Sequence, residues 1–251
     1  MRLSSVNPPP PVPPAVPQPL SYRAANPYYT WLLTLCTGAA IACLSFLVEG
    51  MFNFAQLSAR MRGTPPQNFL RTVYPFVLLG IASSNWIAIW LLTTDDPSPH
   101  RPRRIRAWLL RGAATVTVLF VFMYVLRMLD DWRIRTTTVF LILNSLELAT
   151  TILFWLHMRW LAKKLDFRGS RWRALVAMVG TCATIALLHL GPRASTEVRS
   201  AMSITTFQLT NLRWAMTVLW MVISALVMLR FALGFANEVR LDRKIAASAS
   251  T

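Results

Sequence analysis

The sequence predicts an all-α membrane protein, a bundle of six transmembrane helices preceded by a disordered proline-rich tail. Of its 251 residues, 55% are hydrophobic and 14% are charged, whereas soluble domains have about 25% charged residues. The hydrophobic residues gather in segments of the length that a helix needs to cross a bilayer, about 20 residues. The connections between most of these segments are short, so one membrane domain accounts for residues 28–236.

The N-terminal residues 1–27 contain the tract NPPPPVPPAVPQP. Proline lacks a backbone N–H and fixes φ, so this tract can join neither a helix nor a sheet. We interpret it as an extended, disordered cytoplasmic tail with local polyproline II character. A solvated tether is the favoured role, and a docking segment for a proline-binding protein partner is the alternative.

Six spans are expected, at residues 28–48, 72–92, 107–129, 137–160, 174–190 and 213–236. Residues 237–251 are expected to form a C-terminal cytoplasmic tail. The connections 50–71 and 194–212 are long enough to hold interfacial helices, and the sequence leaves this question open. Arg111 lies one turn inside the third span, and we expect its long side chain to reach back to the lipid headgroups.

Small residues recur at helical spacing in the first span: Cys36, Ala39, Ala40 and Cys43. Such a stripe allows another helix to approach closely in lipid, where burial itself drives little association. The second span has a similar pair, Gly80 and Ser84, four residues apart. Glu49 closes the first expected span, and we place it at the headgroups.

Basic residues are distributed unevenly between the two sides of the expected bundle. Fifteen lie on the side of the two termini and nine on the other side. The positive-inside rule therefore predicts a bacterial-type inner membrane protein with both termini in the cytoplasm. The net charge of +16 then serves contact with anionic lipids at the basic loops. No nucleic-acid recognition motif accompanies it, so no nucleic acid is expected as a partner.

Glu147 stands out because it lies near the middle of the fourth span. A carboxyl at this depth is costly in lipid and has to face protein or water. Asn144 and Thr151 share its helical face by their spacing of three and four residues. Asn85 on the second span lies at similar depth. These four residues, Glu147, Asn144, Thr151 and Asn85, form the candidate intramembrane polar site.

Two groups of residues resemble metal ligands in type but not in spacing. Asp95, Asp96 and His100 lie in a proline-rich connection that imposes no coordination geometry. His157 and His189 fall at opposite ends of two antiparallel spans, too far apart to share one metal ion. The three cysteines form no C-x-x-C pair. We therefore expect neither a metal nor a cofactor.

No pattern in the chain fixes a reaction. It has no H-E-x-x-H, Walker A or dinucleotide-binding motif, and no nucleophile is paired with a base. An enzyme is therefore not expected. The favoured function is a non-enzymatic membrane scaffold or partner subunit, and the alternative is a small proton-linked transporter or channel that uses Glu147.

Overall fold

The computed structural model describes residues 27–62, 69–97, 105–130, 137–167, 169–190 and 206–248. The proline-rich tail and residues 194–205 lie outside this part of the chain. The helices within it are α2 (Pro27–Met61), α3 (Phe69–Leu92), α4 (Ile105–Asp130), α5 (Thr137–Lys164), α6 (Ser170–Leu190) and α8 (Thr206–Ser248). The all-α class is therefore confirmed.

Four of these helices, α2, α3, α4 and α8, are long and apolar enough to cross a membrane. Within the described residues α5 and α6 are not among them. Polar and charged residues recur along α5, among them Asn144, Glu147, His157 and Arg159. The structure thus has the apolar helices of a membrane protein, while the bundle of six spans remains a prediction.

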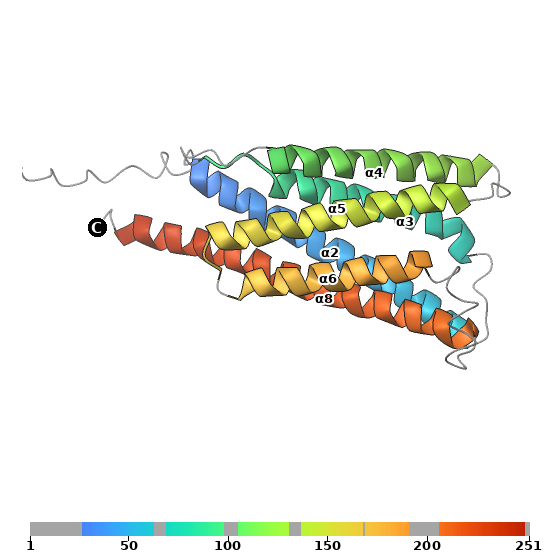
Figure 1. Ribbon diagram of the computed structural model, residues 1–251. Helices are drawn as coiled ribbons and strands as arrows, with labels where there is room; N and C mark the ends of the chain where they lie inside the picture. The colour runs from blue at the N-terminus through green and yellow to red at the C-terminus, as the bar shows by residue number, and fades with distance from the viewer. Residues whose placement is uncertain are drawn as a thin grey trace, which may run out of the picture.

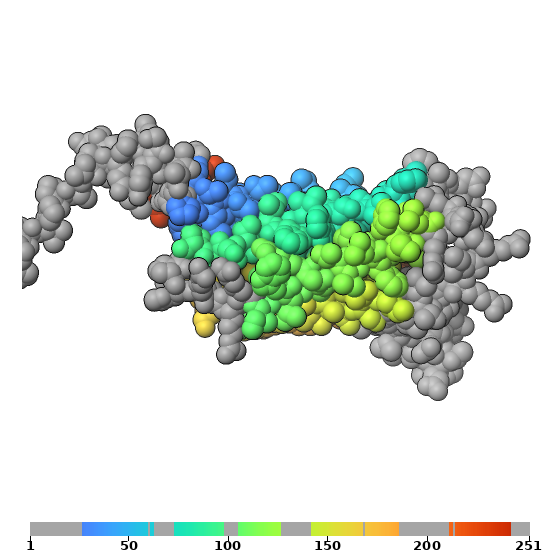
Figure 2. Space-filling model, turned by 90° about the horizontal axis from the view of Figure 1, so that it is seen from above, coloured from blue at the N-terminus to red at the C-terminus, as the bar shows by residue number. Residues whose placement is uncertain are grey.

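Successive helices run in alternating directions (Figure 1), and each packs against the next one in the chain. The last helix, α8, packs against both α6 and α2, so the six helices close a ring. Figure 2 shows the face on which α2, α3, α4 and α5 lie side by side. We call the end of the ring that holds the start of α2 and the end of α8 the termini end.

The ring closes through the small-residue stripe of α2. The thiols of Cys36 and Cys43 donate hydrogen bonds to the backbone carbonyls of Ala232 and Ala225 on α8, at 3.5 and 3.3 Å. Ala39 between them is fully buried, whereas Ala40 faces outward. The expected close approach of another helix is confirmed, and its partner is the last helix of the chain.

Both helices of this pair are longer than the spans expected from the sequence. α2 has 35 residues and α8 has 43, so they extend about 52 and 65 Å at 1.5 Å per residue. α2 continues through the first half of the connection 50–71. α8 includes most of the residues that we assigned to a C-terminal tail.

The surface of the ring is apolar and part of its interior is polar. Large side chains such as Leu44, Leu119 and Leu226 are more than half exposed, whereas Asn144 and Ser224 are buried. Soluble proteins rarely expose apolar patches of this extent. The distribution suits helices that face lipid.

The densest packing lies toward the termini end. The largest fully buried apolar side chains of the ring are Leu32, Leu35, Leu92, Leu110, Trp155, Met158, Leu161, Met228, Phe231 and Phe235. They come from the start of α2 and α4, from the end of α3 and from the second halves of α5 and α8. This layer seals the ring at that end.

Candidate functional site

A cavity of about 150 Å³ lies inside the ring, and side chains from all six helices line it. α2 contributes Glu49, and α5, on the opposite side of the ring, contributes Glu147. Most of the remaining lining is apolar or carries a threonine hydroxyl. The two carboxyl groups therefore share one cavity of low polarity.

The cavity gathers three of the four residues that the sequence singled out. Glu147, Thr151 and Asn85 line it, together with Thr117 and Thr150. Asn144 does not line the cavity, although it is buried, with 6% of its surface exposed.

Threonines join α4 to α5 at the wall of this cavity. The hydroxyls of Thr117 and Thr150 are 3.1 Å apart and share a hydrogen bond. Thr117 also donates to the carbonyl of Ala113, one turn earlier on its own helix. Contacts within α4 and between α4 and α5 therefore hold these hydroxyls in place.

Glu49 corrects an expectation from the sequence. We placed it at the headgroups because the apolar run ends there, but α2 continues to Met61 and leaves Glu49 in the second half of the helix. Ala42, Phe46 and Glu49 all line the cavity, and their spacing of four and three residues puts them on one face of α2. This spacing is the feature of the sequence that could have predicted the position of Glu49 on the cavity-lining face of α2.

Aromatic rings close the cavity on the side of the termini end. Phe46 stacks on Trp155 with a centroid distance of 6.2 Å, and Phe154 meets Trp155 edge to face at 5.2 Å. These contacts join α2 to α5 across the ring. Both carboxyls lie farther from the termini end than this aromatic floor, since α2 and α5 run in opposite directions.

The indole N–H of Trp155 has no hydrogen-bond acceptor among the described residues. Trp155 is 1% exposed and lines the cavity. By contrast, the indole N–H of Trp86, another lining residue, donates to Thr115 Oγ1 at 3.0 Å. An unpaired buried donor costs free energy, so burial of the Trp155 indole N–H without an acceptor is unfavourable.

A polar cluster caps the end of α3, beyond the aromatic floor. Arg111 donates from Nε to Thr93 Oγ1 at 2.8 Å and from its guanidinium to the Thr93 carbonyl at 2.5 Å. The His157 Nε2 atom is hydrogen-bonded to the carbonyl of Leu92 at 3.0 Å. Side chains of α4 and α5 thus satisfy carbonyls that a helix end leaves without partners. Arg111 therefore contacts the end of α3, at the termini end of the ring.

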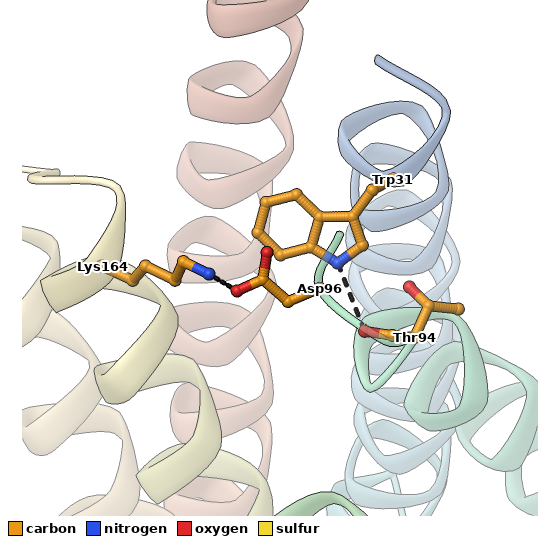
Figure 3. Close-up of polar contacts among 4 residues, drawn as sticks. All are labelled: Trp31, Thr94, Asp96 and Lys164. Carbon is orange, nitrogen blue, oxygen red and sulfur yellow. Dashed lines mark hydrogen bonds and ion pairs between the residues drawn. The ribbon is translucent and has the colours of Figure 1, made fainter. Parts of the chain in front are cut away.

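The connection after α3 is tied to two further helices (Figure 3). The indole N–H of Trp31 on α2 donates to the Thr94 carbonyl at 3.2 Å, and the Lys164 ammonium of α5 forms an ion pair with Asp96. The Lys164 ammonium also lies 5.2 Å from the centroid of the Trp31 ring. This set of contacts fastens the termini end of the ring.

The residues considered as metal ligands are not brought together. His157 lies near the end of α5 at the termini end, and residue 189 lies at the opposite end of α6. His100 is outside the described residues, and Asp96 is engaged by Lys164. Among the side chains that the structure describes, no three His, Cys, Asp or Glu gather as a metal ion requires.

The ion pairs between described residues all lie away from the cavity. Lys164–Asp96 and Arg171–Asp166 are both at the termini end. Each carboxyl in the cavity is stable there either as a neutral acid or beside a bound cation, because an isolated charge is costly in a medium of low polarity.

Comparison with protein-family models, with curated proteins and with solved structures finds no match for this chain. The residues that line the cavity are therefore the basis for inferring a function.

Proposed function

We propose that this protein is a six-span membrane protein that moves a small solute through its central cavity in exchange for protons. The observation that carries the proposal is the presence of Glu49 and Glu147 in one cavity. The sequence showed a single intramembrane carboxyl and favoured a scaffold. A second carboxyl on the opposite wall favours transport, because two acids are a poor means of holding helices together in lipid.

The proposed topology follows the uneven distribution of basic residues. The termini end carries Arg106, Lys163, Lys164 and Arg173 among its described residues, which supports a cytoplasmic position for this end under the positive-inside rule. The membrane is then of the bacterial inner type. In this topology the aromatic floor lies on the cytoplasmic side of both acids.

The proposed mechanism uses the two carboxyls as alternating sites for protons and solute. When both are protonated, the cavity is neutral and needs no counter-ion. When one releases its proton, the remaining charge attracts a cationic group, since interactions between charges are strong at low dielectric. Proton release and solute binding are therefore linked at the same atoms.

Carbodiimide labelling across a pH series tests whether these acids exchange protons. In folded protein in membranes, mass spectrometry is expected to find Glu49 and Glu147 modified, with labelling that falls as the pH rises. A Glu238→Gln variant is the matched control, because this residue of α8 does not line the cavity. Labelling of Glu147 only after unfolding would mean a sealed structural carboxyl, and the scaffold proposal would then replace transport.

A flux measurement tests transport itself. Proteoliposomes loaded with a pH-sensitive dye are challenged with small amines, alcohols and carboxylates, and the change of internal pH is followed. Wild-type protein is expected to exceed Glu147→Gln and Glu49→Gln variants for at least one solute class, while Glu238→Gln matches wild type. Equal rates in wild-type protein and both cavity variants for every solute contradict the proposal.

A further inference from the structure

We infer that the cavity binds a small organic cation, a protonated amine of about the size of benzene. This inference rests on the proposed function in one respect, since it names the solute class of the same site. Three properties of the cavity support it: its charge, its aromatic residues and its volume.

The charge of the cavity selects against anions and favours cations. Glu49 and Glu147 are the acidic residues that line it, and no lysine or arginine among the described side chains does so. An ammonium group between them can donate to both carboxyls. Hydrogen bonds between ionised partners are shorter and stronger than those between neutral partners.

The aromatic floor favours an organic ammonium over a metal ion. Calcium takes six to eight oxygen ligands and magnesium demands an octahedron of oxygens, whereas rings of Phe46, Phe154 and Trp155 form one side of this cavity. An ammonium placed over an aromatic face gains a cation–π interaction. The hydrocarbon part of an amine also fits the apolar walls.

The volume of about 150 Å³ sets the size of the ligand. A cavity of about 150 Å³ between apolar side chains holds one benzene molecule. The ligand therefore has about five to eight non-hydrogen atoms, which excludes lipids, peptides and nucleotides.

Three cyclopentane derivatives separate the charge of the ligand from its hydrocarbon part: cyclopentylamine, cyclopentanol and cyclopentanecarboxylate. Binding is measured by titration calorimetry to the whole protein in phosphatidylcholine nanodiscs, with empty nanodiscs as the blank. This comparison uses wild-type protein, so it does not depend on any variant folding.

We expect cyclopentylamine to bind at least about tenfold more tightly than the alcohol, and the carboxylate is expected not to bind.

Binding of the alcohol or the carboxylate as tightly as the amine overturns the inference, and so does the absence of binding by the amine. The two proposals fail separately. Amine binding without flux contradicts transport alone, and proton-linked flux of alcohols or carboxylates without amine binding contradicts only the solute class.

Discussion

Gly38 on α2 allows α3 to approach closely, and its replacement by alanine is the sharpest test of the ring's geometry. A Cβ atom added there would lie 2.9 Å from Leu91 Cβ, 3.0 Å from Leu92 Cγ and 3.1 Å from the Ala88 carbonyl oxygen. Two of these atoms belong to or adjoin the α3 backbone and cannot move without shifting the helix. Overpacking of this kind costs about 1–3 kcal/mol.

Gly80 on α3 is the matched control. No atom lies within 4 Å of a Cβ added at this position, so Gly80→Ala changes helix propensity alone and stabilises by up to about 1 kcal/mol. Gly38→Ala has the same gain and also the overpacking cost. The difference in unfolding free energy between the two variants is therefore about 1–3 kcal/mol.

The assay is reversible unfolding in mixed micelles, with the free energy of unfolding read from the loss of helical circular dichroism. Gly38→Ala is expected to unfold at lower denaturant fraction than Gly80→Ala. Equal stability of the two variants would falsify the close packing of α2 on α3. A Gly112→Ala variant repeats the control on α4, where an added Cβ also meets no atom within 4 Å.

Two further predictions concern the termini end. Replacing His157 with alanine leaves the Leu92 carbonyl without its 3.0 Å partner and opens a cavity at a site that is 6% exposed. We therefore expect the free energy of unfolding to fall by about 2–4 kcal/mol in the same assay. Unchanged stability contradicts the capping role. For the Lys164–Asp96 pair, whose side chains are 25% and 8% exposed, Asp96→Lys alone should lower the thermal midpoint, with a cost of about 1–3 kcal/mol. The exchanged pair Asp96→Lys with Lys164→Asp should recover most of that loss, and a double variant as unstable as the single one argues against the ion pair.

The sequence predicted well those features that depend on local spacing. Cys36, Ala39 and Cys43 repeat at helical intervals, and the structure uses them for close packing against α8. Gly80 and Ser84 repeat in the same way, yet they border an open groove between α2 and α3. Small residues permit an approach, and the shape of the opposing helix decides whether it occurs.

The sequence predicted less well the features that depend on where a helix ends or on contacts between distant segments. Glu49 follows an apolar run and resembles a residue at an interface, whereas its position in the ring depends on the continuation of α2 to Met61. Arg111 resembles a headgroup anchor until the Thr93 carbonyl is placed beside it. Hydropathy predicts neither the position of Glu49 in the ring nor the contact between Arg111 and Thr93, because both depend on which helices become neighbours.

The first and last helices close the ring, so their contact forms only after nearly the whole chain has been synthesised. Cys43 on α2 and its acceptor Ala225 on α8 are 182 residues apart. At a synthesis rate of about 5–20 residues per second, α2 waits about 10–40 s in the membrane before its partner is made. During this interval its small-residue face is open to helices of other chains. Until α8 is made, the residues of α2 that pack against it lack their partner.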